Sequence, residues 1–157
     1  MEKYQTQITA AIKSLKLADH LVYVTLPVIH EQRLLLKIFD EIHTAIIHTI
    51  EAVLHYETLY RRIRDYDSLT NKLEAFQKCA KNYNISLQQI DQINQIIVVH
   101  NARTKSAMEF VRKEKVVIMS DNLTTKTLDA RTIKKQLLLA KELVVAVNKK
   151  INRTTLS

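Results

Sequence analysis

The sequence predicts a mainly α-helical protein: a four-to-five-helix bundle around one long central helix, with one small β-hairpin near residues 115–128. The chain has no glycine and one proline, Pro27, among 157 residues, so it lacks the residues that build tight turns. Its hydrophobic content of 46% is enough for the core of a single domain over residues 1–157. Apolar side chains recur three and four residues apart, which places them on one face of each helix.

The first helix is expected from Lys3 to Thr25. Pro27 should end it, because proline lacks the amide donor and restricts the residue before it. The apolar line on its inner face consists of Tyr4, Ile8, Ala11, Ile12, Leu15, Ala18 and Val22.

The second and central helix is expected from Glu31 to Asp65. One apolar stripe and a second set on another side make its middle apolar over most of its circumference, which predicts a position at the centre of the bundle. The stripe holds Leu35, Ile38, Ile42, Ala45, Thr49, Ala52, Tyr56, Leu59 and Ile63, widened by Phe39, Ile46, Val53 and Tyr60; the second set is Leu36, Ile47, Ile50 and Leu54.

The expected length of this helix exceeds the size of the domain. It would extend for about 50 Å, whereas a compact chain of this size is about 40 Å across. The helix must therefore kink, project, or be covered by a second chain, so we expect a homodimer or a protein partner.

Three further helices follow. One begins after Asp67 or Ser68, ends near Tyr83 and buries Leu69, Leu73, Phe76 and Ala80. The next spans Leu87–Thr104, because Ser86 with Gln89 forms a capping box and Ile85 with Ile90 has the spacing of a hydrophobic staple. Its inner face carries Ile90, Ile93, Ile97 and His100. The last helix has Asp129 as its N-cap and turns Ile133, Leu137, Ala140, Val144, Val147 and Ile151 inward.

The segment between the last two helices is predicted to contain a short helix over Ser106–Arg112 and then one hairpin. The residues of Lys115–Met119 and Leu123–Thr127 favour strands and flank a polar turn. A lone hairpin is marginal in water, so it should pack on the helices or pair with another edge.

Charge is distributed unevenly. Residues 1–60 hold five basic and seven acidic side chains, whereas the remaining residues hold 19 basic and 9 acidic ones, a net charge of +10. A basic half suggests a polyanionic partner, RNA or DNA rather than a membrane. The N-terminus has no secretory pattern and Cys79 is the single cysteine, so we expect a cytoplasmic protein.

Arginines and tyrosines alternate near the end of the central helix. Tyr60, Arg61, Arg62, Arg64 and Tyr66 form the predicted nucleic-acid site, because guanidinium groups bind phosphate and tyrosines stack on unpaired bases. The alternative is that Tyr56 and Tyr60 belong to the core while the arginines favour the negative helix end. Lys113, Lys115, Lys149 and Lys150 would extend the patch if the fold gathers them.

A polar seam also follows the central helix. His48, Glu51 and His55 lie three and four residues apart, so they could face one metal ion. The alternative, which we prefer, is a solvated ribbon in which Glu51 pairs with His55. The whole seam is Lys37, Glu41, Thr44, His48, Glu51, His55, Thr58 and Arg62.

We do not expect an enzyme or a bound cofactor. Loops that hold phosphates or an oxyanion need glycine, and no local motif supports Cys79 with His100 as nucleophile and base. Ala18–Thr25 with Arg33–Leu36 resembles an uncharacterised family of small archaeal proteins, a resemblance that implies no activity. In helix count and length the chain is also similar to HEPN bundles, but their nuclease motif, an arginine followed four to six intervening residues later by histidine, is absent.

The expected function is therefore that of a helical adaptor that binds RNA or DNA through its basic second half. The alternative is a metal-binding bundle or a HEPN-like partner or enzyme subunit.

Overall fold

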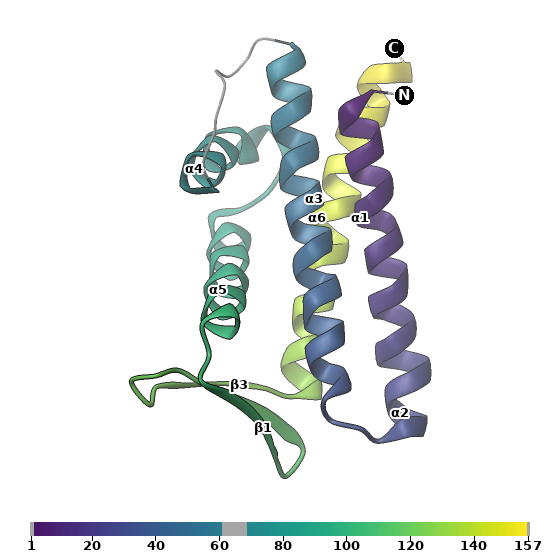
Figure 1. Cartoon of the computed structure of the whole chain (residues 1–157). Coiled ribbons are helices and arrows are strands. Elements are labelled where there is room, and N and C mark those ends of the chain that lie inside the picture. Colours follow the sequence, from purple (N-terminus) through teal and green to yellow (C-terminus); the bar gives the residue numbers. More distant parts are fainter. Residues whose placement is uncertain (1, 61–68, 157) are drawn as a thin grey trace.

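The computed structural model of the chain describes residues 2–60 and 69–156. Three long helices lie side by side: α1 (Lys3–His20), α3 (Leu34–Leu59) and α6 (Ala130–Leu156). Figure 1 shows α4 (Leu69–Ala80) and α5 (Leu87–Thr104) on the other side of α3, and a small sheet across one end of the molecule, beneath α5. The mainly α-helical class predicted from the sequence is confirmed.

Helix α3 is buried at the centre, as predicted. Both apolar sets turn inward, and the fully buried side chains include Leu35, Ile38, Phe39, Ile42, Ala45, Ile46, Ala52, Val53, Leu54 and Tyr56. Leu59 and Tyr60 were expected in the stripe but are 52% and 46% exposed, at the C-terminal end of the described helix.

The helix also begins at Leu34 rather than Glu31, and the predicted stretch beyond Tyr60 lies outside the described residues. A helix of 26 residues is about 39 Å long, which fits a domain of this size. The described helix therefore shows no overhang that a partner must cover. The homodimer stays a prediction, but the length of the helix no longer supports it.

Pro27 does not end the first helix, contrary to the prediction. Helix α1 continues through a π-helical turn, η1 (Leu21–Thr25), into α2 (Leu26–Ile29), and Pro27 occupies the first turn of α2. The wider turn relieves the clash between a proline ring and the carbonyl group of the turn before it. The helix stops at His30, which takes a left-handed conformation with φ of 55°.

The next two helices lie where they were predicted, and Phe76 and Ala80 are buried as expected, whereas Leu73 is only partly buried and the side chain of Leu69 lies outside the described residues. Helix α4 leads through a 3₁₀ turn, η2 (Lys81–Tyr83), to α5 over the predicted residues. The predicted capping box is present, since the Gln89 amide donates to Ser86 Oγ at 3.1 Å and the Ser86 amide donates to Gln89 Oε1 at 2.9 Å.

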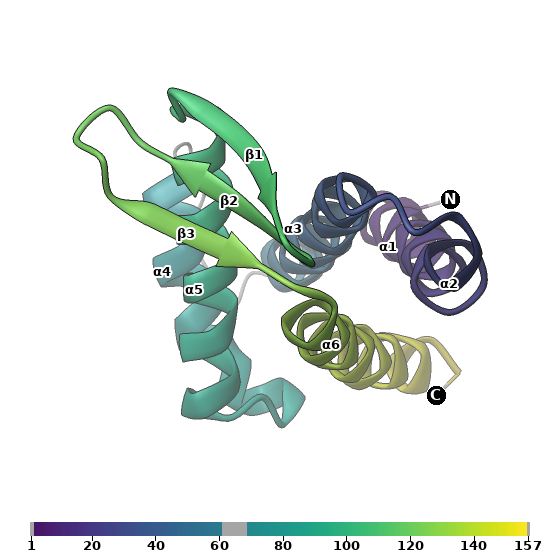
Figure 2. The same ribbon diagram turned by 90° about the horizontal axis from the view of Figure 1, so that it is seen from below.

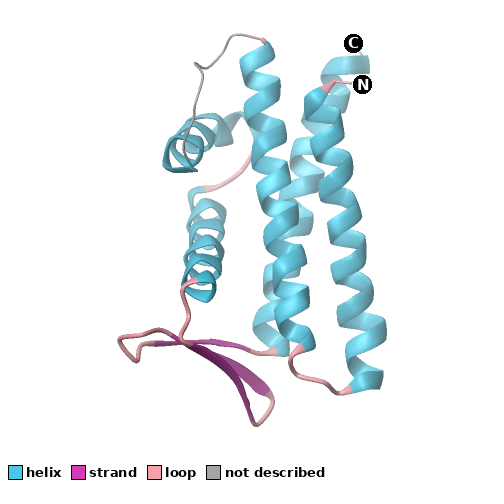
Figure 3. Ribbon diagram, viewed as in Figure 1, coloured by secondary structure: helices cyan, strands magenta, loops and turns pink. Residues whose placement is uncertain are grey.

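The sheet has three antiparallel strands in the order β1-β2-β3, coloured magenta in Figure 3. The strands are β1 (Met108–Arg112), β2 (Lys115–Met119) and β3 (Thr125–Leu128). The short helix expected over Ser106–Arg112 is therefore wrong. Met108–Arg112 instead forms β1, which pairs with β2 and adds a strand to the predicted hairpin. Asp129 caps α6 as predicted: its Oδ1 accepts from the Thr132 amide at 2.7 Å.

Candidate nucleic-acid interface

The site predicted from the sequence is described only in part. Tyr60 is half exposed and its ring centroid lies 4.9 Å from that of Tyr56, which meets Tyr4 edge-on at 5.1 Å. Tyr56 belongs to the core, as the alternative interpretation held, whereas Tyr60 does not. The other members, Arg61, Arg62, Arg64 and Tyr66, lie outside the described residues, so this site stays a prediction.

The fold does not gather all the lysines expected to extend that patch. Lys113 and Lys115 lie in the sheet region, at the end of the molecule opposite the C-terminal end of α3 (Figure 1). The C-terminal part of α6 does lie near the C-terminal end of α3. There, Lys150 donates to the carbonyl oxygen of Asn82 at 3.0 Å, and its Nζ lies 5.9 Å from the ring centroid of Tyr83. The basic half is therefore divided between two ends of the bundle.

The polar seam of α3 takes part in helix packing. His48 Nδ1 lies 2.6 Å from Gln7 Oε1 on α1, and Glu51 Oε1 accepts from Lys72 Nζ on α4 at 2.6 Å. Glu51 Oε2 also lies 3.8 Å from His55 Nε2. The contact between Glu51 and His55 that the solvated-ribbon interpretation predicts is therefore present, but His48, Glu51 and His55 are half-buried between helices rather than fully solvated.

Burial, and next the charge of Lys3, lowers the pKa of His55, which favours its neutral form. In residues 2–60 and 69–156, no three His, Cys, Asp or Glu side chains are arranged to hold a metal ion. The metal-site prediction for His48, Glu51 and His55 therefore gains no support from this arrangement.

The outer face of the sheet is the surface that the sequence did not reveal. Alternation along the strands puts Val116, Ile118 and Leu128 on the inner face, where they are buried. Figure 2 shows the molecule from below, where no helix of the described residues covers the outer face of the sheet. A shallow hollow on this outer face is lined by Phe110, Arg112, Lys113, Lys115, Val117, Met119, Thr125 and Thr127.

Positive charge collects at one end of this face. Lys115 also lines a second hollow, between the sheet, the end of α2 and the first turns of α6. We call the cations of the two hollows the basic surface: Arg112, Lys113, Lys115, Arg131, Lys134 and Lys135. The hollows hold only two carboxylates, Glu114 and Asp129, and hydrogen bonds from Thr132 lower the pKa of Asp129 as it caps α6. The surface is therefore strongly positive.

Lys113 has an unusual backbone conformation within this surface. With φ of 57°, it occupies the first position of the two-residue turn that joins β1 to β2. Turns with a positive φ at this position normally have glycine there, and another residue costs about 1–2 kcal/mol. Because the chain has no glycine, other residues fill its left-handed positions, and His30, Asn84 and Leu123 also have positive φ.

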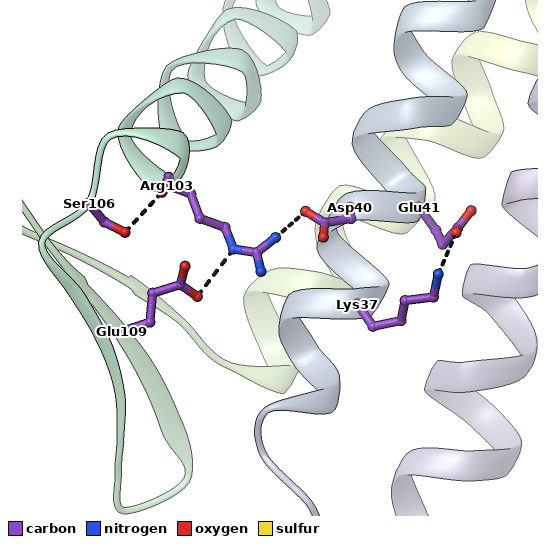
Figure 4. A network of polar contacts seen from close by, with 6 residues as sticks. All are labelled: Lys37, Asp40, Glu41, Arg103, Ser106 and Glu109. Carbon is purple, nitrogen blue, oxygen red and sulfur yellow. Dashed lines mark hydrogen bonds and ion pairs between the residues drawn. The ribbon is translucent and has the colours of Figure 1, made fainter.

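A polar network holds the sheet against the helices (Figure 4). Arg103 on α5 donates to Asp40 on α3, and its Nε donates to Glu109 Oε2 on β1 at 3.2 Å. Ser106 Oγ donates to the Arg103 carbonyl oxygen at 2.9 Å and secures the turn between α5 and β1. One guanidinium group therefore joins three elements and fixes the orientation of the outer face.

The signal for this surface was present in the sequence. Lys115, Val117 and Met119 alternate on one face of a strand, but only the pairing with β1 brings Phe110 and Arg112 beside them.

No helix in the described ranges is both long and apolar enough to span a bilayer. No protein-family model, curated protein or solved structure matches this chain.

Proposed function

We propose that this protein binds single-stranded nucleic acid, RNA or DNA, across the outer face of its sheet and the basic surface beside it. The observation that carries the proposal is the open sheet face on which the ring of Phe110 lies beside Arg112, Lys113 and Lys115. Proteins that bind single strands combine a positive groove for the backbone with side chains on which bases stack.

The charges are suited to such a backbone. Arginine can bind a phosphate group with two parallel hydrogen bonds, and lysine contributes a mobile positive charge. The two hollows share Lys115, so a strand that crosses the sheet meets further cations at the start of α6. Affinity that comes from phosphate contacts depends on salt, because bound counterions are released.

The experiment measures fluorescence anisotropy of labelled oligo(U) and its weakening with salt. If about four phosphates are neutralised, raising salt from about 50 mM to about 200 mM should weaken binding about 50-fold. The double variant Arg112→Glu/Lys115→Glu should abolish binding at the higher salt. Lys13→Glu/Lys16→Glu is the matched control, because it changes the net charge equally at exposed lysines that line neither hollow.

A further variant tests stacking. Phe110→Leu keeps an apolar side chain but removes the ring, and should weaken binding about tenfold. Absence of oligo(U) binding, or equal losses in the control and the double variant, would contradict the proposal. Loss in Arg61→Glu/Arg64→Glu, with the sheet variants unaffected, would instead place the interface at the site predicted from the sequence.

A further inference from the structure

A slot between α5, β3 and α6 opens beside the basic surface. Its volume is about 300 Å³, at the lower end of the range for small-ligand pockets. Thr127 also lines the hollow on the sheet, and Lys135 also lines the second hollow, so the slot borders both. Its apolar lining is Ile96, Val99, Leu128 and Leu139, and its polar lining is Gln92, Gln95, Thr127, Thr132, Lys135 and Gln136.

The polar lining consists of amides, hydroxyl groups and one ammonium group, without a carboxylate. Such a set suits no divalent cation, because these ions prefer carboxylate or imidazole ligands. Amides both donate and accept hydrogen bonds, and the aliphatic side chains offer apolar walls. The slot therefore suits a flat heterocycle with donors and acceptors along one edge.

Gln136 gives this slot a more specific chemistry. Its Oε1 is buried and has no hydrogen-bond partner among the described residues. A buried acceptor without a donor costs free energy, which a ligand N–H group would recover once the amide turns toward the slot. The last side-chain torsion of glutamine is soft, so the amide can turn toward such a donor.

We propose that the slot takes one adenine base from the bound strand, an inference that rests on the proposed function. A glutamine amide pairs with adenine through two hydrogen bonds: its oxygen accepts from the N6 amine and its nitrogen donates to N7. Bases removed from a stack are held by apolar side chains, and the aliphatic lining of the slot would hold this one. Lys135, at the border with the second hollow, binds the adjoining phosphate.

The test compares labelled oligo(A) with oligo(U) of the same length in one buffer. Oligo(A) should bind about tenfold more tightly, because uracil has no exocyclic amine to donate to Gln136. Gln136→Leu should bring oligo(A) to the affinity of oligo(U) and leave oligo(U) unchanged. This variant should fold, because it removes an unpaired acceptor and leucine favours helices. Gln88→Leu, at an exposed position of α5 outside the slot, is the control.

Equal affinities in the wild-type protein, or a preference for oligo(A) that survives in Gln136→Leu, would overturn the adenine slot and leave the proposed function intact. Binding of neither strand would overturn the proposed function and the slot with it. Nuclear magnetic resonance gives a second measurement. The chemical shift of the side-chain amide of Gln136 should change when oligo(A) is added but not when oligo(U) is added. An unchanged signal at saturation with oligo(A) would overturn the slot.

Discussion

The imidazole rings of His43 on α3 and His100 on α5 stack face to face, with centroids 3.6 Å apart and planes 4° apart. Burial, and next the charge of His100, lowers the pKa of His43 to about 4, although Asp40 acts in the opposite direction. Arg103, one helical turn beyond His100, pairs with Asp40 and Glu109. The fold therefore holds His43 neutral in the contact between α3 and α5.

Stability should decrease as the medium becomes acidic. Between pH 6.5 and about pH 4 the unfolded chain binds a proton at His43 that the folded chain does not, so the free energy of unfolding falls as pH falls. Urea titrations across this range should show that the free energy of unfolding depends less steeply on pH in His43→Phe than in the wild-type protein. The difference in slope should correspond to at most one bound proton. The same pH dependence in both proteins would contradict this role for His43.

Removal of the Arg103 bridge should cost more than removal of a surface ion pair. Arg103→Met breaks two half-buried pairs and should lower the free energy of unfolding by about 1–2 kcal/mol. Lys37→Met is the control, because Lys37 is 57% exposed and its 3.0 Å pair with Glu41 is worth less than about 0.5 kcal/mol. All three pairs are drawn in Figure 4. Equal losses would show that Arg103 does not hold the sheet in place.

Lys113→Gly should separate stability from binding. Glycine adopts the left-handed conformation without strain, so the variant should gain about 0.5–1 kcal/mol in denaturant titrations. It also removes a cation of the basic surface, so oligo(U) binding should weaken. Unchanged affinity would mean that the strained turn serves no role in binding.

The hydroxyl group of Tyr83 donates to Glu57 Oε1 at 2.7 Å, and both side chains are buried. Tyr83→Phe should lower the free energy of unfolding by about 1–3 kcal/mol, because it removes a hydrogen bond that the buried carboxylate cannot replace with water. Tyr23→Phe, at a tyrosine that is 53% exposed, should change it by less than about 0.5 kcal/mol. Equal, small effects in both variants would contradict the importance of the contact.

The parts of the fold that could be predicted depend on neighbours in sequence. The buried helix α3 follows from apolar residues three and four apart, and the start of α5 follows from Ser86 and Gln89. The errors arise where distant contacts decide. Met108–Arg112 contains good helix formers but becomes a strand because β2 offers it an edge.

The candidate site was only partly predictable for the same reason. The sequence showed a basic second half, with Lys113 and Lys115 among its cations. It could not show that Phe110 and the cations at the start of α6 meet these lysines, because that requires the order of the strands and the place where α6 begins.

Mapping of the bound strand onto the protein tests the proposed interface most directly. In a titration of isotopically labelled protein with oligo(U), followed by amide chemical shifts, the largest changes should fall on Phe110, Lys113 and Lys115 and on the first turns of α6. Changes confined to the Tyr60 end of α3, or no changes at all, would contradict the interface.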